Sequence, residues 1–108
     1  MSTKEQLREA NERLGTEIAA LRELLTAIGT AMPAIPADDD GYRTYYSLCR
    51  ERLHAVTQIT ACAMDYAGQR TFHGVLHNSA LTLRAELARP LPYKPQGTGN
   101  ERLASVTA

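Results

Sequence analysis

The sequence predicts an all-α protein: a three-helix bundle or helical hairpin with a long N-terminal heptad helix and a disordered C-terminal tail. Three observations lead to this prediction. Apolar residues recur at helical spacing up to about residue 88, prolines and glycines interrupt that spacing, and the aliphatic composition is rich in Ala with one Phe and no Trp. We therefore expect one helical domain over 1–89 and a flexible, proline-containing tail over 90–108.

The first predicted helix spans about 3–31 and carries a heptad pattern. Its apolar or amide side chains recur at alternating steps of four and three residues, and Met32 continues the spacing. We call these residues the seam: Leu7, Asn11, Leu14, Ile18, Leu21, Leu25 and Ile28. Gly15 and Gly29 lie at e positions beside the seam, where each weakens the helix by about 1 kcal/mol relative to Ala. Pro33 and Pro36 then end the helix.

The seam has two interpretations. It resembles a short leucine zipper, because leucine-type residues occupy d positions and Asn11 occupies an a position, where it fixes the register of a parallel dimer. Glu17 at g and Arg22 at the next e position then pair across the two chains. Alternatively, the seam is one wall of an intramolecular bundle, with the first two helices as antiparallel neighbours of similar length. The two interpretations can both hold for different parts of the helix.

The second and third predicted helices span about 41–67 and 72–88. The aspartates at 38–40 supply N-cap candidates and negative charge at the start of the second helix. Gly68 suits a left-handed helix end and Thr71 suits the next N-cap, although one kinked helix is an alternative. The predicted core face of the second helix consists of Tyr42, Tyr45, Tyr46, Cys49, Leu53, Val56, Ile59, Ala63 and Tyr66, and that of the third consists of Phe72, Val75, Leu76, Ser79, Leu83 and Leu87.

The distribution of charge points to protein partners. Residues 1–40 hold four Lys/Arg against eight Asp/Glu, a net −4, and residues 41–108 hold eight against four, a net +4. Opposite charges on the two parts suit self-association, or packing of the two parts on one another, better than a nucleic-acid surface. With no signal-like or membrane-spanning apolar run, we expect a cytoplasmic protein that does not insert into membranes. Cys49 and Cys62 are then free thiols.

Few residues suggest catalysis or metal binding. No glycine-framed serine, paired carboxylates or phosphate-binding loop occurs, so we predict a protein that is not an enzyme and needs no cofactor or metal. The nearest exception is "HGVLH", where His73 and His77 are spaced as two ligands on one helical face, with Cys62, Asp65 or His54 as further ligand candidates. The zinc-protease pattern needs Glu after the first His, and Gly74 stands there.

These features favour a small non-enzymatic helical interaction protein that associates with itself and acts as an adaptor or regulatory subunit. Two alternatives belong to other classes. One is a DNA-binding transcriptional regulator that dimerises through its first helix and contacts phosphates with Arg43, Arg50, Arg70, Arg84 and Arg89. The other is a metal-binding sensor or enzyme that uses His73 and His77.

Overall fold

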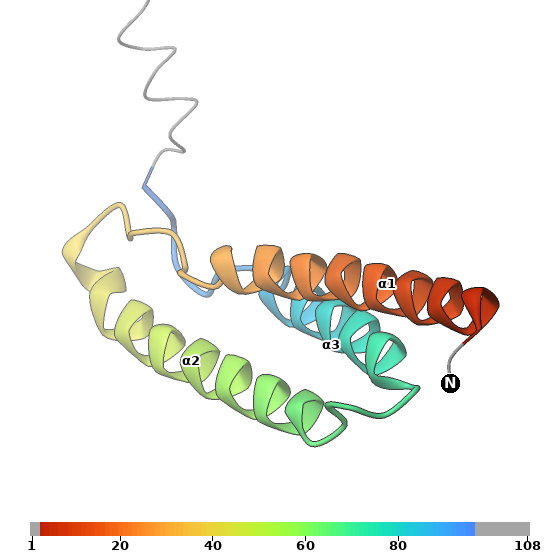
Figure 1. Ribbon diagram of the computed structural model, residues 1–108. Coiled ribbons are helices and arrows are strands. Elements are labelled where there is room, and N and C mark those ends of the chain that lie inside the picture. Colours follow the sequence, from red (N-terminus) through yellow and green to blue (C-terminus); the bar gives the residue numbers. More distant parts are fainter. Residues whose placement is uncertain (1–2, 97–108) are drawn as a thin grey trace, which may run out of the picture.

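Three helices make up the part of the chain that the structure describes, as the sequence predicts (Figure 1). The computed structural model describes residues 3–96, and within them the helices are α1 (Lys4–Gly29), α2 (Tyr42–Met64) and α3 (Phe72–Leu87), with a 3₁₀ turn η1 (Asp39–Gly41) before α2. The described residues form no strand apart from one isolated bridge. The first two helices end at residues 29 and 64, two to three residues earlier than expected.

Local hydrogen bonds explain where the helices begin. Thr3 and Gln6 form a capping box at α1: the Gln6 N–H donates to Thr3 Oγ1 at 3.2 Å, and the Thr3 N–H donates to Gln6 Oε1 at 2.9 Å. The Asp38 carboxylate accepts from the Gly41 N–H at 3.3 Å, so the aspartate run caps η1, and α2 continues directly from it. Thr71 stands at the N-cap of α3, as expected, but its side chain makes no capping hydrogen bond.

Two glycines shape the connections. Gly68 adopts a left-handed φ of +86°, which a residue with a Cβ rarely takes, and α2 and α3 are therefore two separate helices. Gly41 is buried against the linker before α2, where a Cβ would lie 2.8 Å from Pro36 Cβ. Only glycine allows the backbone at residue 41 to approach Pro36 this closely, and this contact determines where α2 starts.

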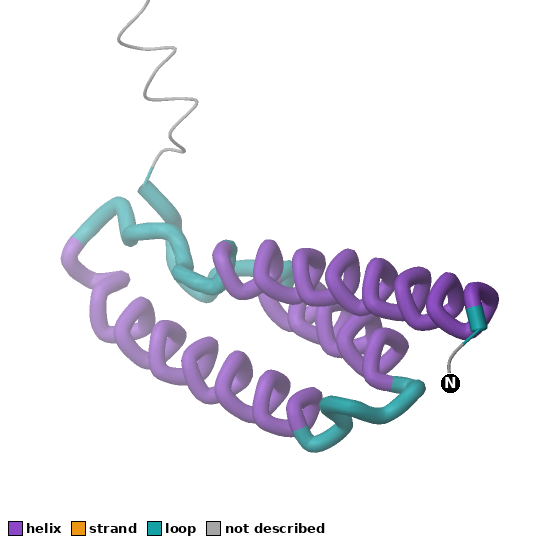
Figure 2. Tube along the Cα trace, in the orientation of Figure 1, coloured by secondary structure: helices purple, strands orange, loops and turns teal. Residues whose placement is uncertain are grey.

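The core forms where α3 meets the other two helices. Leu76, Ala80 and Leu83 of α3 are fully buried. They join a cluster that also contains Phe72, three residues of α1 (Ala20, Leu24 and Ala27) and Ala63 of α2. Figure 2 shows the chain reversing twice, so that α1 and α3 run in the same direction and α2 runs opposite to both.

The packing order differs from the expected pairing of the first two helices. α3 packs against both α1 and α2, whereas α1 and α2 make little direct contact. The physical reason is the alanine stripe on α1, because small side chains let α3 approach closely, so that Leu76 and Leu83 of α3 are buried in one cluster with Ala20 and Ala27. Similar length, the reason for pairing the first two helices, does not determine which faces fit together.

The segment after α3 folds back onto the linker between α1 and α2. The Ala37 N–H donates to Lys94 O at 2.9 Å and the Gln96 N–H donates to Ile35 O at 2.7 Å, on either side of the Pro36–Pro95 bridge. The Tyr93 hydroxyl donates to Ala34 O. Residues 90–96, expected to belong to a flexible tail, are thus paired with the linker, and the rest of the predicted tail, 97–108, lies outside the described residues.

Candidate functional site

Most of the seam faces outward on α1. Leu7, Leu14, Ile18 and Leu25 are between 51% and 65% exposed, and Asn11 is exposed beside them. Leu21 and Ile28 are half-buried because they pack against the edge of the core cluster. Apolar side chains left this open along one helix form a patch of the kind that marks a protein contact.

α1 buries a different stripe against its own core. The buried residues are Ala20, Leu24 and Ala27, which occupy c and g positions when Leu7 and Leu14 are assigned to d. These positions lie beside the a and d positions of the seam on the helical wheel. The helix therefore carries two adjacent apolar stripes. The first, which we call the alanine stripe, consists of Ala20, Leu24 and Ala27 and packs on α3. The second is the seam, which the described chain covers only in part.

An apolar groove lies between the C-terminal end of α1 and the facing part of α2. It has a volume of about 340 Å³ and continues the seam at Ile28. We call it the α1/α2 groove; its main apolar lining residues are Ile28 and Met32 on one side and Cys49, Leu53 and Val56 on the other. Met32 and Leu53 are 73% and 67% exposed, so the groove is open to solvent. Sequence reasoning placed Leu53 in the core of the second helix, and here the structure corrects it: α2 packs on α3 through Ala63 and turns Leu53 away.

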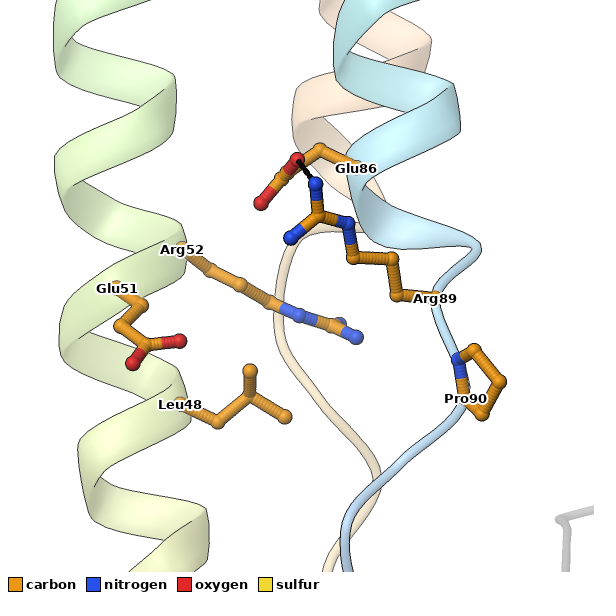
Figure 3. A pocket seen from close by; sticks show the side chains of 6 residues that line it. All are labelled: Leu48, Glu51, Arg52, Glu86, Arg89 and Pro90. Atoms are coloured by element: carbon orange, nitrogen blue, oxygen red, sulfur yellow. Dashed lines mark ion pairs between the residues drawn. The ribbon is translucent and has the colours of Figure 1, made fainter.

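Arg52 lies beneath this groove and joins three helices. It is 8% exposed, and its guanidinium donates to Ala31 O at 3.2 Å, two residues after the end of α1, and to Leu87 O at 3.4 Å, at the last residue of α3. A cation at two helix C-termini is electrostatically favourable. Figure 3 shows the Arg52 side chain reaching from α2 toward Arg89, which is paired with Glu86 at 3.2 Å, around a small pocket of about 60 Å³. This arrangement holds the helices that border the groove.

The two histidines of "HGVLH" have different surroundings. His77 Nδ1 lies 2.8 Å from Glu23 Oε2, which links α3 to α1, whereas His73 Nδ1 is buried and has no hydrogen-bond partner within residues 3–96. Among the described residues no three His, Cys, Asp or Glu side chains come together as metal ligands. Sequence reasoning missed Glu23 as the partner of His77, because its helical-wheel comparison did not place α1 beside α3.

The tyrosines at the start of α2 form an aromatic cluster. Ring centroids of Tyr42, Tyr45 and Tyr46 lie 5.4 to 6.1 Å apart, and Tyr93 stacks edge-on against Tyr45 at 6.4 Å. The pKa of the Tyr93 hydroxyl is raised mainly by burial, and the Arg52 guanidinium opposes that effect. The cluster holds residues 90–96 against the linker between α1 and α2, which gives the rings of Tyr42, Tyr45 and Tyr93 a structural role. Tyr46 is the most exposed of the four, at 63%.

The arginines of the DNA-binding alternative come from α2, α3 and the segments that follow them. Arg89 among them is already ion-paired with Glu86, and Arg70 lies beside Glu9 and Arg13 of α1. The five arginines are thus spread over two helices and two connecting segments, and their positions add no support to that alternative.

Comparisons with protein-family models, with curated proteins and with solved structures found no match to this chain. Among the described residues, none of the helices combines the length and the hydropathy needed to cross a bilayer. The exposed seam and the α1/α2 groove are therefore the features from which a function has to be argued.

Proposed function

We propose that this protein is a non-enzymatic helical interaction protein that associates with itself through the seam of α1 and acts as an adaptor or regulatory subunit in the cytoplasm. The observation that supports the proposal best is the exposure of the seam beside a separate, buried alanine stripe. A helix that needed only to pack on α3 would need one apolar stripe. The second stripe is then available for another chain.

The partner that fits the seam best is a second copy in parallel orientation. Parallel pairing brings Asn11 opposite its counterpart, where the two amides can hydrogen-bond to each other. It also brings Glu17 at g near Arg22 at e of the second copy, a pair of opposite charge. An antiparallel pair places e positions opposite e positions, where Arg8 and Arg22 would repel each other.

Light scattering over a range of protein concentrations tests this proposal. The wild type is expected to be a dimer, and Ile18→Glu to be a monomer because it places a charge in the centre of the seam. Asn11→Leu is expected to remain associated but to form mixed or larger species, because the residue that specifies register is lost. Ala19→Glu, on the exposed side of α1 away from the seam, is the matched control and should remain a dimer. A wild type that stays monomeric at all concentrations would contradict the proposal.

A further inference from the structure

We propose that the α1/α2 groove receives the C-terminal part of α1 from a second copy, and that Leu53 of one copy packs against Gly29 of the other. The inference rests on the proposed self-association through the seam and specifies which part of α2 joins the interface. The groove continues the seam without interruption, because Ile28 belongs to both. A helix lying along the seam therefore reaches the groove at its C-terminal end.

The heptad positions determine which side of the incoming helix faces α2. Ile28, at a d position of α1, lines the groove, and so does Ala31, which follows the helix end at Gly29 and continues the g positions in the sequence, so α2 lies beside the d and g side of α1. In a parallel pair, the g side of one helix is opposite the e side of the other. The e side of the second copy's α1 therefore faces α2. Its residues are Arg8, Gly15, Arg22 and Gly29.

No contact among residues 3–96 of the chain requires glycine at either of the two glycine positions on this side. Glycine is unfavourable in a helix, yet a Cβ at Gly15 or Gly29 would meet no atom within 4 Å. Neither residue has the left-handed conformation that requires glycine, since Gly68 alone among the described residues has a positive φ. At Gly29, the e position nearest the groove, the missing side chain allows close approach by a group from a second copy.

Leu53 is at the correct height to fill that space. The groove is lined by Ile28 in the last turn of α1, by residues 31–33 directly after the helix, and by residues 49, 52, 53 and 56 of α2, so the end of α1 and this part of α2 lie at the same level. In a parallel, in-register pair, Gly29 of the second copy is also at this level. Leu53, 67% exposed in the single chain, then packs over the bare backbone at Gly29.

Substitutions at the two contact positions give the first test, with the dimer dissociation constant measured by sedimentation equilibrium. Gly29→Gln places a side chain in the space proposed for Leu53, and Leu53→Gln removes the apolar contact in both halves of the dimer. Each is expected to weaken the dimer roughly tenfold or more. Gly15→Gln is the matched control: it is also a glycine in open space at an e position, but it lies outside the segment that faces the groove. It should change the constant less than about threefold.

Circular dichroism separates an interface effect from a folding effect. Glutamine favours a helix more than glycine does, so both Gln variants at the glycines should keep or increase helicity. A weaker dimer with unchanged helicity supports the contact. A Gly29→Gln dimer as tight as the wild type overturns it.

Disulfide formation between two different variants gives a second, direct test. In a background of Cys49→Ala and Cys62→Ser, Gly29→Cys and Leu53→Cys proteins are purified separately, mixed and oxidised. A disulfide that links one protein to the other can form only between copies. The proposal predicts that the mixture cross-links faster than either protein alone, and equal rates would overturn it.

The outcomes also distinguish this inference from the proposed function. If Ile18→Glu dissociates the dimer but the Gly29 and Leu53 variants neither weaken it nor cross-link, the seam remains the interface and the groove contact is wrong. If Leu7→Cys cross-links to Leu25→Cys faster than Leu25→Cys cross-links to itself, the pair is antiparallel and the contact is also wrong. If the wild type does not dimerise, both proposals fail together.

Discussion

Arg52 shows how a single side chain stabilises the arrangement of all three helices. It is a buried cation whose partners are two backbone carbonyls, Ala31 O and Leu87 O. We expect Arg52→Met to lower the free energy of unfolding by about 2–3 kcal/mol, because the methionine fills part of the space but leaves both carbonyls without a donor. Urea unfolding measures this loss. Arg52→Lys should recover part of it, since an ammonium keeps the charge but lacks the planar fork that reaches two acceptors.

The neighbouring arginine provides the control for this prediction. Arg50 lies on the same helix and is exposed, so Arg50→Met should change the free energy of unfolding by less than about 0.5 kcal/mol. Equal effects of Arg50→Met and Arg52→Met would show that the two carbonyl contacts contribute little. The spacing of the sequence does separate these two arginines, because Arg52 lies three residues after Cys49 and four before Val56, in step with the predicted core face, and Arg50 does not. A buried arginine is rare, and only the convergence of two helix ends makes position 52 a favourable place for one.

At the scale of the helices, the alanine stripe of α1 determines how α1 meets α3. Ala27 is 2% exposed and faces a helix whose Ala80 is fully buried. Ala27→Leu should therefore push the helices apart and lower the free energy of unfolding by about 1–3 kcal/mol. Measuring it by urea unfolding in the Ile18→Glu background keeps any self-association out of the comparison. The matched substitution is Ala19→Leu on the exposed side of α1, and a loss as large as that of Ala27→Leu would contradict close packing at the stripe.

The alanine stripe also marks the part of the fold that could not be predicted from the sequence. Helix number, the break at Gly68 and the core positions Phe72, Leu76 and Leu83 followed from spacing and turn chemistry. The contact face of α1 did not, because alanines carry little apolar area and the leucines of the seam dominate the pattern. The prediction that Leu53 is a core residue was wrong for a related reason. The spacing of a helix shows which residues share a face, but it does not show which neighbouring helix covers that face.

The molecule as a whole has a small core and a large open surface. Within residues 3–96, four of the eight buried hydrophobic residues of the core are alanines, which bury little apolar area. α1 and α2 both pack on α3 rather than closely on each other, so each also presents apolar side chains to solvent, among them Ile18 and Leu53. Covering these side chains in a dimer would add apolar burial that one chain does not provide. Folding and association should therefore be coupled.

This coupling predicts that thermal stability depends on protein concentration. Over a roughly hundredfold increase in concentration, the wild-type unfolding midpoint should rise by roughly 5–10 °C, because mass action favours the associated folded state. The midpoint of Ile18→Glu should stay constant over the same range. Circular dichroism melting curves measure both proteins under identical conditions. A wild-type midpoint independent of concentration would mean that the three helices are stable without a second chain, and the exposed seam would then contribute nothing to folding.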